Sequence, residues 1–285
     1  MKLATISKDG KTGLASIDAN GNARAVFEGD PGYLGDLDAA VAGGSAGLAA
    51  AGIAAEAGVS LETGSFAYLS VVRRPAKIIC IGLNYSDHAA EGGFEVPEHP
   101  TVFVRFASSL VGEGEALIVP PESDKFDYEA ELAVVIGKGG RRIPKETALD
   151  HVAGYSIFND ASVRDFQLRT PQWTVGKNFD GTGAFGPHLV TPEAVAPGCA
   201  GAKIETRLNG EVVQSSNTDQ LIFDVATLIS DLSVAMTLEP GDVIITGTPS
   251  GVGAARTPPL WMKPGDICEV EIEGLGVLTN PVRAE

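Results

Sequence analysis

The chain has 285 residues, a length that can bury a large hydrophobic core and divide into one large domain and one small domain. Hydrophobic residues make up 44% of it and the mean hydropathy is +0.11. No apolar stretch reaches the ~18 residues that a membrane span needs. A net charge of −16 disfavours nucleic acid or an anionic membrane as a partner.

Residues 1–74 are predicted to form a small N-terminal domain. The first ten residues contain no long apolar region, so we expect no secretory signal. Short strands are predicted at residues 2–6, 13–17 and 23–27, separated by Asp-Gly and Asn-Gly turns. The alanine-rich residues 34–58 are expected to be helical, with an interruption at Gly43-Gly44. This part contains neither histidine nor cysteine, which indicates a scaffold.

Residues 75–285 are predicted to form the larger domain, which begins after Arg73 and Arg74 at Pro75. Short apolar runs separated by glycine and proline favour a β-rich domain of the α+β class. Strands are predicted at 77–83, 101–106, 116–119, 132–136 and 152–158, a hairpin at 203–214 and an amphipathic helix at 223–236. The cysteines are odd in number and widely spaced, which predicts reduced thiols in a cytoplasmic protein: Cys80, Cys199 and Cys268.

The first polar cluster lies at residues 82–93, which contain Asn84, Tyr85, His88 and Glu91. His88 and Glu91 are three residues apart, so a helical turn would bring their side chains together. A carboxylate beside an imidazole raises its pKa, which suits a general base. The alternative is a surface helix start with an incidental pair.

Two carboxylates interrupt the apolar run that ends at Ile136. Side chains alternate along a strand, so Glu129 and Glu131 are predicted to face the same way. Two like charges on a half-buried face repel each other unless a cation lies between them. Hard oxygen ligands suit Mg²⁺, Mn²⁺ or Ca²⁺. The alternative is a solvated polar face on an edge strand.

Three later segments add polar residues. Asp160 ends an apolar strand and is either a helix N-cap or a third carboxylate for the metal. Lys177, between aromatic and glycine neighbours, either lies at the surface or holds a carboxylate or oxyanion. The glycine-rich residues 247–253 would allow a ligand to approach the backbone. They are not a phosphate loop, because no Gly-Lys-Ser/Thr follows.

Five motifs in this order over residues 75–283 resemble the fumarylacetoacetate hydrolase family. They are Asn-Tyr-x-x-His-x-x-Glu, Asp-Tyr-Glu-x-Glu-Leu, Gly-Tyr-x-x-x-Asn-Asp-x-Ser-x-Arg-Asp-x-Gln, Gly-Lys-Asn-Phe-Asp and Gly-Asp-Val-Ile-x-Thr-Gly-Thr-Pro-x-Gly-Val-Gly. The resemblance implies a catalytic domain built as a mixed β-roll or sandwich, in a homodimer. It also implies Mg²⁺ (or Mn²⁺ or Ca²⁺) held at Glu129, Glu131 and Asp160.

The same resemblance assigns roles to further side chains. It implies a catalytic dyad of His88 and Glu91 and an active-site lysine at Lys177. The residues expected to contact substrate are Tyr85, Arg105, Gln167 and Thr248. Arg105 departs from the family pattern, because relatives often have a lysine followed by proline there.

We expect the enzyme to hydrolyse a carbon–carbon bond of a 2,4-diketo acid, giving pyruvate and a carboxylic acid. We expect this substrate to be an acylpyruvate. A 2,4-diketo-3-deoxy sugar acid and an intermediate of aromatic degradation are two further options. His88, oriented by Glu91, would activate the water that attacks the distal carbonyl, and Lys177 and Gln167 would stabilise the oxyanion. The metal would serve as Lewis acid and template, and no organic cofactor is expected.

Three alternatives remain open. Oxaloacetate decarboxylation and the isomerisation or decarboxylation of 2-hydroxymuconate-type compounds would use the same metal site. The His–Glu pair favours hydrolysis over simple decarboxylation, which needs no base near a distal carbonyl. The third alternative is a β-rich protein without enzymatic activity that binds Ca²⁺ structurally.

Overall fold

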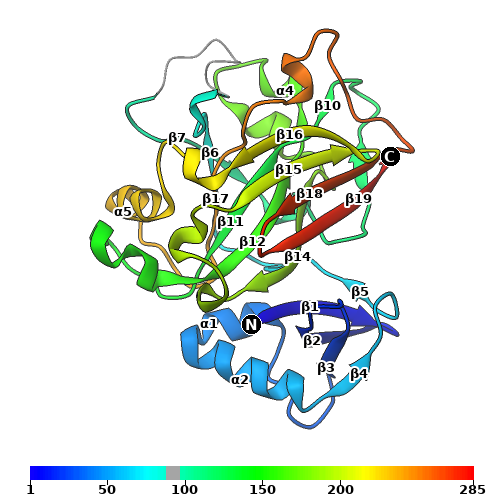
Figure 1. Cartoon of the computed structure of the whole chain (residues 1–285), viewed down its shortest axis with the longest axis vertical. Helices are drawn as coiled ribbons and strands as arrows, with labels where there is room; N and C mark the ends of the chain where they lie inside the picture. The colour runs from blue at the N-terminus through cyan, green and yellow to red at the C-terminus, as the bar shows by residue number, and fades with distance from the viewer. Residues whose placement is uncertain (88–96) are drawn as a thin grey trace.

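The computed structural model describes residues 1–87 and 97–285. Within these residues, a mixed sheet of twelve strands runs from the N-terminal unit into the rest of the chain (Figure 1). Its main path has the order β4-β3-β2-β1-β14-β12-β11-β17-β6-β7. The two strands off this path are β5, which pairs with β1, and β8, which pairs with β14.

The N-terminal unit combines short strands with two helices at the bottom of Figure 1. The second helix packs against β2 and β3, and the first packs against the second helix and β1. Asp36 caps the first helix by accepting from the N–H of Ala39 at 3.3 Å. The break between the helices falls at Gly43, as predicted. The elements are β1 (Lys2–Lys8), β2 (Lys11–Ile17), β3 (Ala23–Phe27), α1 (Leu37–Ala42), α2 (Gly44–Glu56), β4 (Val59–Leu61) and β5 (Ala67–Tyr68).

Strand β1 joins this unit to the rest of the sheet. It pairs with β14 (Gly183–Val190) at Lys2↔Val190 and Leu3↔Leu189. The N-terminal ammonium also donates to Oγ1 of Thr191 at 2.5 Å. The backbone hydrogen bonding is therefore continuous from residues 1–74 into the larger part, and the division at residue 74 stays a prediction.

The central strands carry dense runs of valine, isoleucine and leucine, and both β11 and β12 are buried along their whole length. Strand β11 is antiparallel to β12 and β17, whereas β17 is parallel to β6. The strands are β6 (Ile78–Gly82), β7 (Thr101–Arg105), β8 (Leu110–Val111), β11 (Ala130–Ile136), β12 (Val152–Asp160) and β17 (Val243–Ile245).

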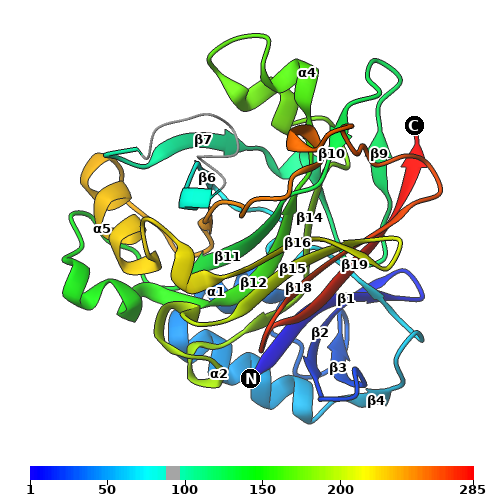
Figure 2. The same ribbon diagram turned by 45° about the horizontal axis from the view of Figure 1, so that its top comes forward.

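A second sheet, of five strands among the described residues, packs against the first (Figure 2). Its strands alternate buried and partly exposed residues, because one face covers the core that includes Leu132, Ile157, Ile204 and Val270. The order is β16 (Glu211–Asn217), β15 (Lys203–Leu208), β18 (Ile267–Ile272), β19 (Gly276–Ala284) and β9 (Leu117–Val119). The predicted α+β class with a β-rich mixed roll or sandwich is confirmed.

Short segments complete the chain. The predicted helix at 223–236 is α5 (Val225–Ala235), capped by Asp224, which accepts from the N–H of Thr227 at 2.7 Å. None of the helices that the structure describes is long and apolar enough to cross a membrane.

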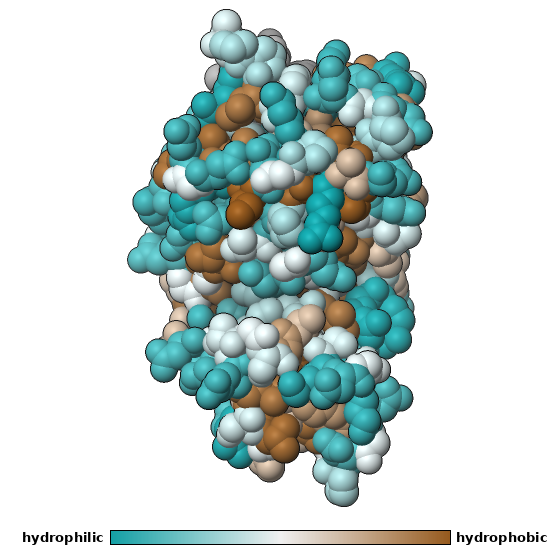
Figure 3. All heavy atoms as spheres, turned by 90° about the vertical axis from the view of Figure 1, so that its right-hand side faces the viewer, coloured by the Kyte–Doolittle hydropathy of each residue, from teal (hydrophilic) through white to brown (hydrophobic). Residues whose placement is uncertain are grey.

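On the face in Figure 3, hydrophilic and apolar side chains are interspersed over both units. The remaining elements are α4 (Arg164–Gln167), the two-stranded sheet of β10 (Phe126–Asp127) and β13 (Ser162–Val163), and the 3₁₀ turns η1 (Ala107–Ser109), η2 (Lys145–His151), η3 (Trp173–Lys177), η4 (Pro192–Ala194), η5 (Pro197–Cys199), η6 (Thr218–Gln220) and η7 (Gly253–Ala255).

Candidate active site

Three carboxylates meet where β11 begins and β12 ends. Glu129 precedes β11, Glu131 lies inside it, and the backbone N–H of Asp160 donates to the carbonyl of Glu129 at 2.9 Å. This antiparallel register places one oxygen of each side chain within 4.8 Å of the others. All three residues are buried. The structure thus brings together the three residues predicted as metal ligands.

The electrostatics of this cluster call for a cation. Burial raises the pKa of Glu131 well above its ordinary value, and the charges of Asp160 and Glu129 raise it further. Carboxylate oxygens are the ligands that hard divalent cations prefer. The donor set therefore fits such a cation, and these three residues could hold it.

Lys177 supplies one positive charge from within the protein. Its Nζ lies 2.7 Å from Oε2 of Glu129 and 2.6 Å from Oδ2 of Asp160. Burial alone would lower the pKa of Lys177, but the charges of Asp160 and Glu129 raise it, and the net direction is upward. The predicted active-site lysine therefore lies inside the acidic cluster rather than at the surface.

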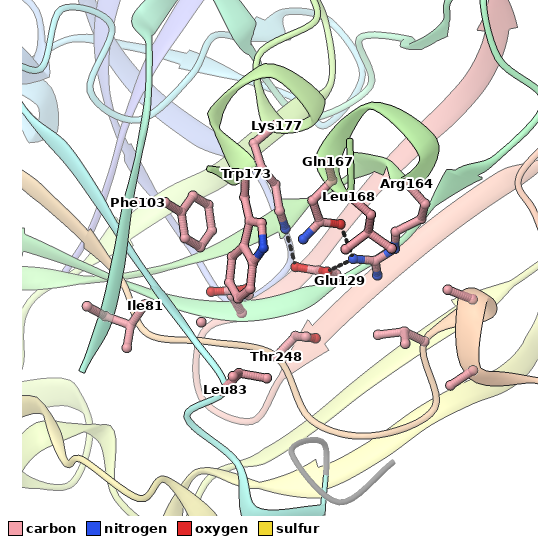
Figure 4. Close-up of a pocket in the computed structure, with 15 residues that line it drawn as sticks. Ile81, Leu83, Phe103, Glu129, Arg164, Gln167, Leu168, Trp173, Lys177 and Thr248 are labelled. Carbon is pink, nitrogen blue, oxygen red and sulfur yellow. Dashed lines mark hydrogen bonds and ion pairs between the residues drawn. The ribbon is translucent and has the colours of Figure 1, made fainter. Parts of the chain in front are cut away.

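A glycine lets the two segments that carry Lys177 and Gln167 approach each other. Lys177 ends η3 and Gln167 ends α4. A Cβ on Gly176 would lie 2.2 Å from the backbone nitrogen of Gln167, which no side chain permits. Figure 4 shows the resulting arrangement, in which Lys177 and Gln167 point from one wall toward Glu129.

Arg164 is a site residue that the sequence analysis missed. Its Nη1 lies 2.5 Å from Oε1 of Glu129 and donates to Oε1 of Gln167 at 2.8 Å, while Nε donates to Oδ2 of Asp127 at 2.8 Å. Its Nη2 is buried and has no hydrogen-bond partner among the described residues. The sequence offered one indication of a role for Arg164, its place four residues after Asp160 in one of the five family motifs. Its burial could not be predicted, because burial depends on the tertiary fold.

These residues form the floor of a pocket of about 360 Å³ (Figure 4). The floor is polar and charged, whereas the walls are mostly apolar, as is usual for small-molecule sites. The polar lining comes from Glu129, Glu131, Arg164, Gln167, Lys177 and Thr248, and the apolar lining includes Ile81, Leu83, Phe103, Leu168, Trp173 and Val252.

The segment after β17 supplies the opposite wall. Thr248 lines the pocket, and its predicted contact with substrate stays a prediction. The N–H of Gly247 donates to Oε2 of Glu131 at 2.6 Å. Gly247 has a φ of 104°, and a Cβ there would lie 2.8 Å from Cβ of Asn84. Only glycine therefore fits between this backbone and the segment that carries Asn84.

Arg105 is placed behind the site. Its Nε is paired with Oδ1 of Asp160, and its Nη1 donates to Oγ of Ser109 at 3.1 Å. The guanidinium lies 5.6 Å from the ring centroid of Phe158. Arg105 is not among the described residues that line the pocket. This position supports Asp160 rather than a ligand, so the predicted substrate contact by Arg105 does not follow from the geometry.

Tyr85 also lies outside the pocket lining that the structure describes. It is fully buried beside Leu221, with which it forms an isolated β-bridge. Burial and the charge of Glu131 raise the pKa of its phenol. The substrate contact assigned to Tyr85 stays a prediction.

His88 and Glu91 lie outside the described residues, so the predicted dyad cannot be placed. The preceding residues are held in position. Nδ2 of Asn84 donates to the carbonyl of Thr246 at 2.7 Å, and Oγ of Ser250 donates to Oδ2 of Asp87 at 2.8 Å. The chain that leads to His88 is thus attached to the wall that carries Thr248.

Comparison with known proteins gives a consistent result. Residues 77–283 match the family described as fumarylacetoacetate (FAA) hydrolase C-terminal. The chain is 48% identical to the mitochondrial oxaloacetate tautomerase Fahd2a of Rattus norvegicus over 216 residues, which are 75% of this chain and 69% of that protein.

Two solved structures resemble the whole chain. The fumarylacetoacetate hydrolase of Exiguobacterium antarcticum is 36% identical, with a TM-score of 0.88 and complete coverage of both chains. The 5-carboxymethyl-2-hydroxymuconate delta-isomerase of Mycobacterium smegmatis is 30% identical, with a TM-score of 0.79 and complete coverage of both chains. The names of these proteins include a hydrolase and an isomerase on one fold.

Proposed function

The chain belongs to the fumarylacetoacetate hydrolase family, and from that premise we propose that it interconverts the keto and enol forms of a small 2-oxo dicarboxylic acid of the oxaloacetate type. The family consists of enzymes that act on small keto acids. The tautomerase activity is supported by the 48% identity with a protein named oxaloacetate tautomerase. The substrate class is supported by one observation in the pocket.

That observation is the free end of Arg164. Its Nη2 is buried and has no partner among the described residues, and Arg164 is one of the residues that line the pocket. A buried guanidinium nitrogen without a partner is costly, and a carboxylate is the group that complements it best. A pocket of about 360 Å³ with an acidic cluster beside this nitrogen suits a short acid with a second carboxylate.

Glu129, Glu131 and Asp160 would hold a divalent cation, for which we propose Mg²⁺, and the cation would supply Lewis-acid polarisation of the 2-oxo group. Lys177 can stabilise negative charge on the substrate oxygen as the enol forms, because its ammonium is buried beside this cluster. Gln167, held by Arg164 at 2.8 Å, can donate to the same substrate through its amide nitrogen. The apolar walls, Trp173 and Phe103 among them, exclude water from the reacting atoms.

Tautomerisation breaks a C3–H bond and forms an O–H bond at C2, so a base must take the proton from carbon and an acid must deliver one to oxygen. We assign the carbon proton to His88, oriented by Glu91. The support for this dyad is the sequence motif.

Hydrolysis of a 2,4-diketo acid is the second candidate. It is supported by the likeness to a structure named fumarylacetoacetate hydrolase, which the whole chain matches. In this reaction His88 would activate a water instead of moving a proton on carbon. Assembly as a homodimer and a location in the cytoplasm stay predictions.

One set of assays separates the candidates. The loss of enol absorbance is followed on oxaloacetate, and pyruvate release is followed on oxaloacetate and acetylpyruvate, each with Mg²⁺ or with EDTA. Tautomerisation that needs metal and releases little pyruvate supports the proposal. Pyruvate release from acetylpyruvate alone would establish the hydrolase, and release from oxaloacetate alone would establish a decarboxylase.

A further inference from the structure

Asp127 is a fully buried carboxylate that contacts the pocket residue Arg164. Its Oδ1 accepts from the N–H of Gly253 at 2.7 Å and from its neighbour Tyr128 at 2.9 Å. Its Oδ2 accepts from the N–H of Ala254 at 2.9 Å and from Nε of Arg164 at 2.8 Å. Asp127 does not line the described pocket, so it can act on a ligand only through the groups it holds.

The guanidinium of Arg164 is divided between two carboxylates. Nε is bound by Asp127, whereas Nη1 is shared between Glu129 at 2.5 Å and Gln167 at 2.8 Å. A guanidinium can also bind one carboxylate with two nitrogens, which is its strongest arrangement. With Nε bound to Asp127, only Nη1 contacts Glu129, and Nη2 has no partner among the described residues.

Glu129 is the metal-ligand candidate with a cation at each of its oxygens. Arg164 lies at Oε1 and Lys177 at Oε2, 2.7 Å away. Each of these cations opposes the binding of a divalent ion to the same carboxylate, since the charges repel. The affinity of this site for metal therefore depends on how strongly Arg164 is drawn to Glu129.

We infer that Asp127 is a positioning residue that limits Arg164 to a single contact with Glu129, through Nη1, and so keeps this carboxylate available to a divalent cation. The inference rests on the metal site of the proposed function but not on the reaction catalysed there. A merely structural role for Asp127 would lie in its bonds to Gly253 and Ala254. The two roles differ in whether the effect of Asp127 depends on Arg164.

A double-mutant cycle measures that dependence. The dissociation constant of Mn²⁺ alone is determined by titration calorimetry for the wild type, Asp127→Asn, Arg164→Gln and the double variant. Loss of a residue that orients a metal ligand typically weakens metal binding 10–100-fold, so Asp127→Asn is expected to weaken Mn²⁺ binding about tenfold. In the Arg164→Gln background the same change is expected to alter binding less than about twofold, because no guanidinium remains to be released.

Asp242→Asn provides a matched control. Asp242 is also fully buried, binds Lys77 at 2.9 Å and accepts from the N–H of Glu239 at 2.8 Å, but it lies away from the described pocket lining. This variant is expected to lower the melting temperature and leave the Mn²⁺ affinity unchanged.

Three results would overturn the inference: no Mn²⁺ binding by the wild type, no loss in Asp127→Asn, or the same tenfold loss in both backgrounds. If Asp127→Asn is recovered only as aggregate and adding Arg164→Gln restores folded protein, the Mn²⁺ affinity of Arg164→Gln decides: tighter binding than in the wild type supports the inference, and equal or weaker binding overturns it. Aggregation of the double variant as well would assign Asp127 to the 253–254 backbone and overturn it. Wild-type protein that binds Mn²⁺ but fails the tautomerase assay would reject the proposed function alone.

Discussion

The backbone N–H of Gly247 donates a 2.6 Å hydrogen bond to Oε2 of Glu131. This bond stabilises a carboxylate whose pKa is raised by burial and by two neighbouring acids. It also fixes the start of the segment that supplies Thr248 to the pocket. A single backbone contact thus connects a candidate metal ligand to the opposite wall.

Gly247→Ala is expected to destabilise the protein and weaken metal binding. An alanine would be strained at a φ of 104°, at a cost of about 1–2 kcal/mol, and its Cβ would meet Cβ of Asn84 at 2.8 Å. Gly241→Ala is the control, because Gly241 has a φ of 91° with nothing within 4 Å of a Cβ. Chemical denaturation and Mn²⁺ titration of both variants check this. Equal effects of the two would show that close approach to Asn84 is unimportant.

Lys177→Met is expected to make folding stability depend more strongly on metal. The ammonium contacts both Glu129 and Asp160, so its loss removes one of the cations that offset the buried carboxylates and increases their repulsion until another cation binds. The rise in melting temperature between EDTA and Mg²⁺ should therefore be larger than in the wild type. We also expect kcat to fall 10²–10³-fold, the usual effect of removing one charge-stabilising donor. A smaller Mg²⁺ shift than in the wild type would contradict the neutralising role.

Arg105→Met is expected to cost about 3–5 kcal/mol of folding free energy, the range for breaking a buried ion pair from one side. Both Arg105 and its partner Asp160 have side chains with no exposed surface. The control is Arg207→Met, since the pair of Arg207 with Glu271 is partly exposed and should contribute about 1 kcal/mol or less. Urea denaturation compares the two variants. A small loss for Arg105→Met would show that Asp160 has no need of this partner.

Glu113 is expected to make stability fall as the pH rises. Burial raises the pKa of its carboxyl from 4.5 to about 7, with a smaller contribution from Glu269. Because the folded protein binds this proton more tightly than the unfolded chain, the stabilising contribution is complete below pH 4.5 and is lost as the pH rises through about 7. Glu113→Gln should remove this dependence and stabilise the protein at pH 8 by on the order of 1 kcal/mol.

Denaturation curves at pH 5 and pH 8 test this for the wild type and Glu113→Gln. A substitution at exposed Glu28, Glu28→Gln, serves as the control and should leave the difference between the two pH values unchanged. If the wild type and Glu113→Gln show the same difference, the carboxyl of Glu113 is not the group responsible.

The carboxylate cluster was predictable because it depends on local geometry. Strand alternation placed Glu129 and Glu131 on one face, and the end of the next apolar strand placed Asp160 nearby. Arg164 and Asp127 were missed, because the hydrogen bonds that hold a buried charged residue come from segments distant in sequence and leave no local signal. The motif position of Arg105 indicated a substrate contact, whereas its pairing with Asp160 depends on how β7 lies relative to β12.

Features of the fold that depend on residues adjacent in sequence could be predicted, whereas the long-range pairing of strands could not. The hairpin of β15 and β16 formed at Asn209-Gly210, and the helical break fell at Gly43, because both are set by residues adjacent in sequence. The pairing of β1 with β14 joins segments far apart in the chain and had no local signal. The sequence therefore indicated two units but not the sheet that connects them.

That long-range pairing has a consequence for the order in which the chain folds during synthesis. Strand β1 pairs with β14 at residues 189 and 190, so it has no partner in the central sheet until those residues have left the ribosome. Meanwhile β1 can pair with β2, and β2 with β3. A ribosome stalled before residue 189 would therefore carry a nascent chain in which the part of β1 that pairs with β14 is open to other chains.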